Sequence, residues 1–270
     1  MKTGKEVNVA VHSYIDNLLN LSASRQFVLS ILAGCFVTFG AQLSIHLSTG
    51  IEQKGVQLVL FGLGFVFGFS FVILTGSALF TSINFQIPMF SWQDKSQNRS
   101  GSVLRLWLIA LLGNFLGTLI TSTMMMGAGT VQGAFLDRAG EIILKKIPEK
   151  TIFHWFQIVL SAILANWLVA IATYNCSVAD NLSEKVMGLL FPVLSFAILG
   201  FQHSVANMAY MCIGIVNGLD LTVFDAVFFN LVPAALGNMI GAIVLVSFPL
   251  FYIYTFTKCP ENPTKETVEV

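Results

Sequence analysis

The stretch GFQHSVANM at residues 200–208 places an ionisable side chain, His203, where the chain is otherwise uncharged. Residues 186–219 around it contain no Asp, Glu, Lys or Arg. An ionisable group at the depth of a bilayer is costly, and one that is kept usually faces a cavity, a partner or a transported substrate. Position alone leaves two interpretations of His203 open, a functional group or a structural hydrogen bond.

The composition assigns the chain to a membrane. Of its 270 residues, 55% are hydrophobic and 10% are charged, and the mean hydropathy is +0.77. Water-soluble domains are far more polar, and about 20 apolar residues suffice to cross roughly 30 Å of hydrocarbon as a helix. The candidate crossings are residues 26–47, 57–90, 102–126, 152–174, 186–216 and 227–255. We therefore expect an all-α membrane protein with six transmembrane helices embedded in the lipid bilayer.

The segments outside the expected membrane domain are polar. The first 25 residues carry five charged side chains and lack a short apolar core followed by a cleavage site, so we expect no cleaved signal peptide. Residues 8–22 fit an amphipathic helix on the membrane surface and a loosely ordered terminus equally well. We expect an N-terminal segment at 1–25, a six-helix transmembrane domain at 26–255 and a polar tail at 256–270.

Six crossings put both termini on one side of the membrane. Assigning that side to the cytoplasm places nine of the 14 Lys and Arg residues there, in keeping with the excess of basic residues in cytoplasmic loops. Basic residues between the third and fourth segments fall on the other side and argue against this orientation. We expect cytoplasmic termini and a location in the inner, or plasma, membrane. The zero formal net charge gives no reason to expect nucleic-acid binding.

The sequence lacks the common motifs of catalysis and metal binding. It has no Ser-His-Asp constellation, paired carboxylates, HExxH motif or P-loop, and the six expected crossings contain no acidic residue. Its four cysteines are scattered and form no C-x-x-C pair. The sequence therefore predicts neither an enzyme nor a metal site, a cofactor or a disulfide framework.

The two halves of the chain share a motif. LGNFLG at residues 112–117 in the third segment corresponds to LGNMIG at 236–241 in the sixth. Each half has three crossings, an odd number, so the second copy enters the membrane from the opposite side. The sequence therefore predicts an inverted 3+3 repeat, the arrangement that builds a pathway at a pseudo-two-fold axis.

The second and fifth segments are too long for one straight span. Residues 55–93 and 186–219 are uncharged, yet two ordinary spans in either run would leave almost nothing for a turn. We expect each helix to be interrupted, at residues 75–82 and 200–204. Irregular backbone at this depth is tolerated only where it is buried in protein or lines a wet cavity. Paired interruptions in two halves point to a substrate site.

The residues near the two interruptions suggest a narrow pore. Apolar side chains on both sides of one polar group are typical of a hydrophobic constriction. An anion that loses its hydration there needs compensation of several kcal/mol. Half-helix N-termini supply positive potential, and His203 is able to exchange a proton with a weak acid. Lys150, before the fourth span, either gathers anions or is an ordinary flanking lysine.

These residues resemble the formate/nitrite transporter family, which includes formate, nitrite and hydrosulfide channels and lactate carriers. The resemblance covers residues 26–255. GFQHSVANM is similar to that family's G-F-E-H-x-V-A-N-M motif, and LFT at 79–81 to the loop that interrupts its second helix. Lys150 stands 16 residues before Asn166, as the family's vestibule lysine does, and Gly237-Asn238 matches its last-helix G-N.

The resemblance implies an aquaporin-like protomer in a homopentamer, with one pore per subunit. It implies passage of small monovalent anions or their acids, with formate or nitrite ahead of lactate or hydrosulfide. His203 is then the central histidine and Thr81 its partner. Further pathway residues are Asn238, Asn207 and Lys150, and the expected constriction residues are Leu79, Phe80 and Phe196.

One position departs from the family pattern. Gln202 stands where the family has an acidic residue before the histidine. A neutral amide there leaves the anion, the choice between channel and proton symporter, and the direction of transport open. Two other functions stay open as well: an aquaporin-type pore for neutral solutes, and a membrane scaffold subunit that conducts nothing.

Overall fold

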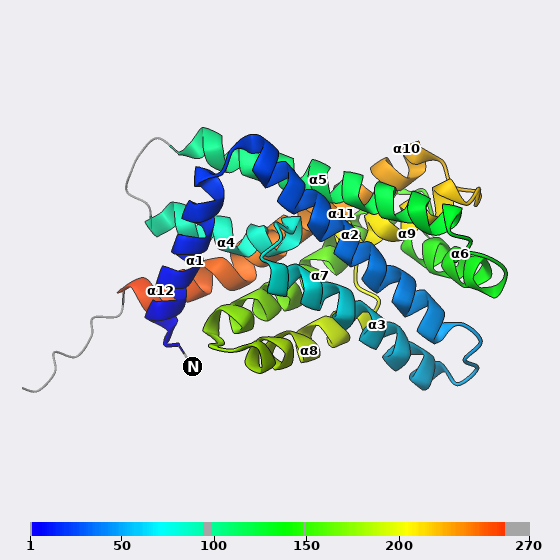
Figure 1. Cartoon of the computed structure of the whole chain (residues 1–270), viewed down its shortest axis with the longest axis horizontal. Helices are drawn as coiled ribbons and strands as arrows, with labels where there is room; N and C mark the ends of the chain where they lie inside the picture. The colour runs from blue at the N-terminus through cyan, green and yellow to red at the C-terminus, as the bar shows by residue number, and fades with distance from the viewer. Residues whose placement is uncertain (1, 94–98, 148, 257–270) are drawn as a thin grey trace, which may run out of the picture.

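The computed structural model describes residues 2–93, 99–147 and 149–256, and this part of the chain is helical (Figure 1). The expected polar tail at 256–270 falls outside it, apart from the backbone of its first residue. The elements are α1 (Gly4–Asn20), α2 (Ala23–Ser48), α3 (Lys54–Thr75), α4 (Phe80–Gln93), α5 (Ser100–Gly127), α6 (Ala134–Lys146), α7 (Ile152–Val178), α8 (Leu182–Ile198), α9 (Ser204–Val216), α10 (Val223–Ala226), η1 (Val227–Leu231), α11 (Val232–Ala242), η2 (Ile243–Ser247) and α12 (Phe248–Phe256).

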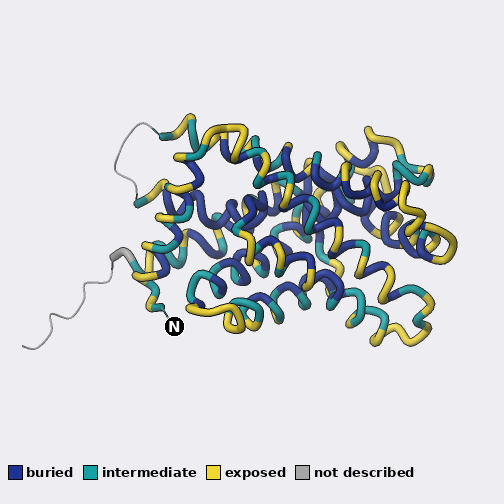
Figure 2. The backbone as a smooth tube through the Cα atoms, viewed as in Figure 1, coloured by how far each residue is buried: buried dark blue, intermediate teal, exposed yellow. Residues whose placement is uncertain are grey.

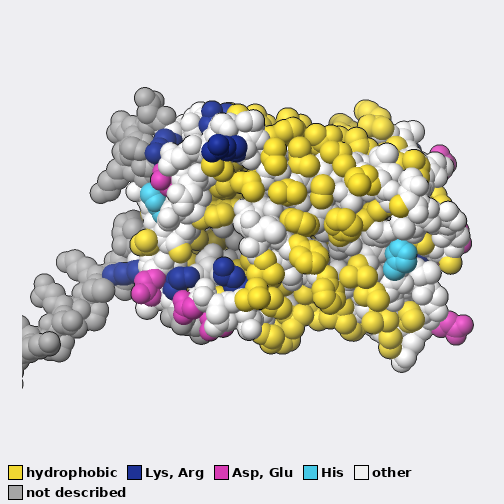
Figure 3. All heavy atoms as spheres, viewed as in Figure 1, with side chains coloured by type: hydrophobic (Ala, Val, Ile, Leu, Met, Phe, Trp, Pro, Cys, Tyr) yellow, Lys and Arg dark blue, Asp and Glu magenta, His cyan; other side chains and the backbone are white. Residues whose placement is uncertain are grey.

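Within the described residues, five helices are long and apolar enough to cross a membrane: α2, α3, α5, α7 and the continuous segment Val223–Tyr254. The remaining expected crossing, residues 186–216, is divided between α8 and α9. On the face shown in Figure 3, hydrophobic side chains cover the middle of the molecule, and charged side chains gather towards its two ends. The molecule is an all-helical protein with several membrane-spanning helices.

The N-terminal segment forms helix α1. A capping box begins it, because the Thr3 side chain accepts a hydrogen bond from the Glu6 N–H while Glu6 bonds back to Thr3. One face of α1 is buried against α4, α7 and α12, and α1, α4 and α12 lie towards the left end of Figure 1. The segment is therefore helical rather than loosely ordered, and its buried face packs against other helices of the protein.

A helix that we did not expect, α6, lies between α5 and α7. It forms at the opposite end of the molecule from α1 (Figure 1). Its buried face includes two cations, Arg138 and Lys146. The Arg138 guanidinium donates to Ser48 Oγ at 3.3 Å and pairs with Glu141 at 2.6 Å. Three of the four basic residues that argued against the expected orientation, all except Lys150, thus belong to a folded element.

Helices α3 and α8 end in the same way. The N–H of Gly76 donates to Ile73 O and the N–H of Ser77 to Val72 O, a pattern that Gly200 and Phe201 repeat with the last turn of α8. Gly76 and Gly200 have φ angles of 66° and 70°, a left-handed conformation that costs glycine little. The chain is then non-helical until Phe80 and Ser204, where α4 and α9 begin.

Two asparagines hold these non-helical stretches. Asn114 accepts from the Phe80 N–H at 2.8 Å and donates to the carbonyls of Ala78 and Ser30. In the second half, Asn238 makes an equivalent set of bonds, accepting from the Ser204 N–H at 2.8 Å and donating to Gln202 O and Ala162 O. Each asparagine therefore satisfies backbone groups that the broken helix leaves without partners.

The packing around these asparagines requires small residues. A methyl group on Gly117 would collide with the backbone of Ile31, and one on Gly241 with the backbone of Ile163. The close approach of α2 to α5 and of α7 to α11 therefore depends on the absence of a side chain at these two glycines. The tube in Figure 2 shows the buried residues concentrated between these helices.

Candidate functional site

The centre of the molecule contains one hydrogen-bonded polar pair between the two halves. Thr81 Oγ1 lies 2.9 Å from Nε2 of His203, and neither residue is exposed. Thr81 is in the first turn of α4, whereas His203 directly precedes α9. The predicted partners from the two interruptions are therefore in contact.

The hydrogen bonds of His203 define its tautomer. Nδ1 accepts from the Ala206 N–H at 3.0 Å and caps α9, so this nitrogen carries no proton. In the neutral ring the proton is then on Nε2, and Nε2 donates to the Thr81 hydroxyl oxygen. The hydroxyl proton of Thr81 is then not used in this bond.

Aromatic rings cover one side of the pair. Phe196 stacks on the His203 ring with centroids 5.4 Å apart and an interplanar angle of 19°. Phe65 packs edge-on against both rings. Leu79 and Phe80, the other two residues expected at constrictions, are buried in the same apolar cluster. The polar pair is thus enclosed by apolar side chains.

A cavity of about 100 Å³ opens on the side of these rings, and we call it the basic cavity. Phe65, Phe196 and Phe201 form its inner part. Its cationic lining residues are Lys54, Arg138, Lys145 and Lys146. Because α6 supplies three of these cations, this helix gives the cavity its positive charge.

Lys146 is the most buried of these lysines. Its ammonium donates to the carbonyls of Gly200 and Phe201 at 3.2 and 2.9 Å. Lys146 lies outside the membrane-spanning helices, and its burial lowers its pKa to about 8. No carboxylate among the described residues is within ion-pair distance of its ammonium group.

Gln202 lies at the centre of an amide network beside Lys146. Its Oε1 accepts from Asn207 at 2.7 Å and from Asn230 at 3.2 Å, and its Nε2 donates to the Lys146 carbonyl at 3.5 Å. Asn230 belongs to the π-helical turn η1 and also donates to the Lys146 carbonyl. The expected pathway residue Asn207 is therefore fully engaged through its Nδ2 with this network.

Two other expected residues lie apart from the central pair. Lys150 pairs with Asp225 at 2.7 Å and does not line the basic cavity. Asn238 directs its side chain to backbone groups of the second half. Of the eight expected residues, the structure brings together Thr81, His203 and Phe196 in direct contact, with Leu79 and Phe80 in the surrounding cluster.

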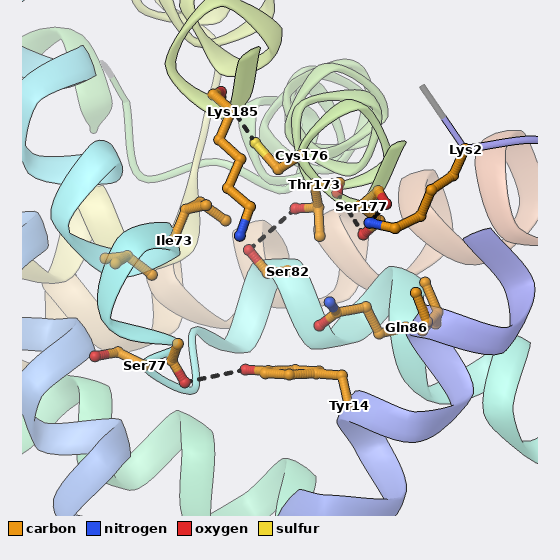
Figure 4. Close-up of a pocket in the computed structure, with 14 residues that line it drawn as sticks. Lys2, Tyr14, Ile73, Ser77, Ser82, Gln86, Thr173, Cys176, Ser177 and Lys185 are labelled. Carbon is orange, nitrogen blue, oxygen red and sulfur yellow. Dashed lines mark hydrogen bonds between the residues drawn. The ribbon is translucent and has the colours of Figure 1, made fainter. Parts of the chain in front are cut away.

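A second cavity, of about 210 Å³, opens at the other end of α3 and α8, and we call it the polar cavity. It reaches the non-helical stretch at Gly76 and Ser77, and Ser82 lines it directly after Thr81. Figure 4 shows the hydroxyl, amide and ammonium groups that point into it. The sequence analysis placed Gly76, Ser77 and Ser82 in the expected interruption at 75–82 but named none of the lining residues as a pathway residue.

Comparison with known proteins agrees with this geometry. A model of the formate/nitrite transporter family matches residues 5–252. A probable formate transporter of Methanothermobacter thermautotrophicus is 31% identical over 86% of this chain and 88% of its own length. A formate-nitrite transporter of Entamoeba histolytica is 33% identical over 85% of this chain, which spans 64% of that relative.

Solved structures resemble the fold over almost its whole length. A pentameric formate channel with formate bound has a TM-score of 0.74 at 26% identity, covering 86% of this chain and 98% of that one. An FNT family ion channel has a TM-score of 0.81 at 21% identity, covering 92% and 98%. The chain therefore belongs to the formate/nitrite transporter family and is a multi-pass membrane transport protein, not an enzyme.

Proposed function

We propose that this protein passes small monovalent anions, or the weak acids that carry them, across a membrane. The path runs from the basic cavity past Thr81 and His203 to the polar cavity. Formate and nitrite are the substrates that we expect first, followed by lactate and hydrosulfide. The likeness to a channel that was solved with formate bound supports this substrate class.

The observation that carries the proposal is the position of the central pair between two cavities. Lys54, at the start of α3, lines the basic cavity, whereas Val72 and Ile73, near its end, line the polar cavity. Helix α8 runs the other way, from Lys185 in the polar cavity to Ile198 in the basic one. A helix of 22 residues is about 33 Å long, so the cavities lie on opposite sides of the molecule.

The charges of the basic cavity fit an anionic substrate. Three of its cations come from α6, and Lys146 has no acidic partner among the described residues. Cations in a partly enclosed cavity raise the local concentration of anions. We assign the role of collecting anions to Lys146, since Lys150, the residue expected from the sequence, pairs with Asp225.

At the centre, we propose that Thr81 and His203 act as hydrogen-bond donors. The ring donates a hydrogen bond through Nε2 to the Thr81 hydroxyl, and this hydroxyl donates a hydrogen bond to the substrate. Uptake of a second proton at Nδ1 would break the bond from the Ala206 N–H. Substrate recognition in this geometry therefore needs no change in the charge of His203, and a proton that accompanies the anion is carried by the substrate as its acid.

We also propose the finer features of the architecture. The equivalent bonds of Asn114 and Asn238 and the matching ends of α3 and α8 support six crossings as an inverted repeat with two interrupted helices. We propose a homopentamer with one pore per subunit. Both termini and the polar cavity then face the cytoplasm, and the basic cavity faces the outside of the inner, or plasma, membrane.

Flux into liposomes tests the proposal. Purified protein is reconstituted, and uptake of formate, nitrite, lactate and hydrosulfide is compared with that of empty liposomes at pH 5.5 and pH 7.5, values about one unit on either side of the ordinary histidine pKa. We expect formate or nitrite uptake above the empty control. Water or glycerol uptake without anion uptake would favour the neutral-solute pore instead, and no uptake at all would favour the scaffold.

A further inference from the structure

We propose that the polar cavity holds a second anion-binding site, formed by Lys185, Ser82 and Gln86, which takes a small carboxylate or an oxyanion of similar size. This inference rests on the proposed function, because it places a second station on the same path. Nothing in the family resemblance or in the sequence analysis assigns a role to these three residues.

The charge of the site comes from Lys185. It lies in the first turn of α8 and is half-buried, and Figure 4 shows its ammonium group pointing into the cavity towards Ser82. No carboxylate among the described residues lies within ion-pair distance of it.

Ser82 supplies a hydrogen-bond donor beside this ammonium. It is buried, and its Oγ accepts from the Thr173 hydroxyl at 3.2 Å. Ser82 also lines the cavity, so its hydroxyl is a polar group within reach of a ligand there. Because Ser82 directly follows Thr81 in α4, the site lies next to the central pair along the path.

Gln86 provides the independent sign of a ligand. It lies one turn further along α4 and is only 8% exposed, and it lines the cavity. Its Oε1 is buried without a hydrogen-bond partner in the part of the chain that the structure describes. In Figure 4 its amide nitrogen is on the side of Ser82. A buried amide oxygen without a partner is costly. A bound acid donates to this oxygen, and a bound anion accepts from the amide nitrogen.

Another lysine of the cavity is already engaged. The Lys2 ammonium donates to the carbonyls of Ser177 and Ala179, each at 3.1 Å, so it fixes α1 to the end of α7. Lys185 is therefore the cation available to a ligand inside the cavity. It gives the path a positive group at this end, as Lys146 does at the other.

Transport measured separately from each side tests the site. Cells and inside-out vesicles that contain the protein are supplied with radiolabelled formate, and the concentration at half-maximal flux is determined for each direction. In Lys185→Met we expect this concentration to rise about three- to tenfold for uptake from the polar-cavity side, as loss of about 1 kcal/mol of attraction implies. Uptake by this variant from the basic-cavity side at low formate stays within twofold of the wild-type value.

The controls separate charge from folding. Lys185→Arg keeps the cation and retains the wild-type value within about twofold, and Gln86→Leu raises the half-maximal concentration in the same direction as Lys185→Met. Arg25→Met removes a cation from the start of α2, at the same end of the molecule but away from the cavity, and changes nothing. Size-exclusion profiles confirm that all variants assemble like the wild type.

The outcomes distinguish the two proposals. No formate flux in the wild type refutes the proposed function. Normal wild-type flux with an unchanged half-maximal concentration in Lys185→Met, in both directions, refutes the second site and leaves the proposed function intact. An equal loss in both directions in Lys185→Met, with Lys185→Arg equally impaired, shows a structural role and also refutes the site.

Discussion

Phe80 and Ser204 occupy equivalent positions in the two halves of the protein, because the backbone N–H of each donates to an asparagine side chain at 2.8 Å. This equivalence pairs Leu79 with His203, the residue before each of them. The pseudo-symmetric backbone therefore carries an asymmetric centre, with an apolar side chain in one half and a hydrogen-bonding ring in the other. The first half still contributes a polar group to the centre, because the Thr81 hydroxyl bonds to the His203 ring.

Removal of the Thr81 hydroxyl tests whether the central pair recognises the substrate. Thr81→Val keeps the shape but leaves an anion without this donor, and an unmet hydrogen bond costs about 1–3 kcal/mol. We expect formate flux in liposomes to fall about fivefold to 150-fold, and that of His203→Ala to fall as well.

Thr118→Val is the matched control for Thr81→Val. It removes another buried hydroxyl, which donates to the Phe115 carbonyl at 2.7 Å and does not line either cavity. Its flux stays near the wild-type value. Equal flux in Thr81→Val, His203→Ala and the wild type would exclude the pair from the path.

Asn114 is expected to contribute strongly to stability. Asn114→Leu leaves the Phe80 N–H and the carbonyls of Ala78 and Ser30 without their partner. At about 1–3 kcal/mol for each buried group, the variant loses about 3 kcal/mol or more. Its thermal transition in detergent falls well below that of the wild type.

Two comparisons make the stability test specific. Asn238→Leu, the equivalent change in the second half, causes a loss of similar size. Asn20→Ala removes an exposed bond to Asp16 and shifts the transition only slightly, since such surface changes stay within about 0.5 kcal/mol. A wild-type transition temperature for Asn114→Leu would contradict the role that we give to these side chains.

Lys146 gives the basic cavity a pH dependence in the alkaline range. Burial lowers its pKa to about 8, so the ammonium is charged at pH 7 and loses its charge as the pH rises through 8. At low formate, uptake from the basic-cavity side is expected to fall between pH 7 and pH 9. Lys146→Arg stays charged and abolishes this fall, whereas Lys146→Met has low uptake at both pH values.

Formate stays an anion across this range, which makes it the appropriate probe. Its carboxyl group, with a pKa of about 4, is ionised at both pH values. If uptake by Lys146→Arg fell with pH as it does in the wild type, the fall would come from another titratable group and not from Lys146.

Because Gln202 is neutral, we expect it to leave the positive charge of the Lys146 ammonium without a balancing negative charge. Gln202→Glu puts a carboxylate in the amide network next to the carbonyls that hold Lys146. The new charge attracts the ammonium and repels the substrate, so we expect the half-maximal formate concentration on the basic-cavity side to rise about threefold or more.

A double-mutant cycle isolates this coupling. If Gln202→Glu acts through Lys146, its effect is smaller in the Lys146→Met background than in the wild type. Fully additive effects of the two substitutions would disprove the coupling.

The sequence predicted the elements whose signal is local. Long apolar runs indicated the spanning helices, and Gly76 and Gly200 marked the ends of α3 and α8. His203 could be identified because a single ionisable ring in an uncharged segment needs a physical reason. The shared LGN motif contained Asn114 and Asn238, whose equivalent bonds now explain it.

Residues that depend on tertiary contacts were out of reach. Lys146 and Lys150 are indistinguishable in the sequence as flanking lysines, and only the packing of α6 buries the first while Asp225 engages the second. Lys185 and Gln86 line one cavity because α8 and α4 both pack against α7, which no short-range pattern encodes. The amphipathic pattern of α6, with two cations on its buried face, was the signal that could have revealed this helix.

Asn114 and Asn238 each brace only the half in which they reside, since all their partners lie within that half. Hydrogen bonds that join the two halves near the centre include those of Thr81 to His203, of Asn166 to the Thr81 carbonyl and of Thr173 to Ser82. The pair that we propose to recognise the substrate thus lies where two separately braced halves of the protein meet. A small shift of one half relative to the other would change the geometry of the Thr81–His203 pair before it distorted either half.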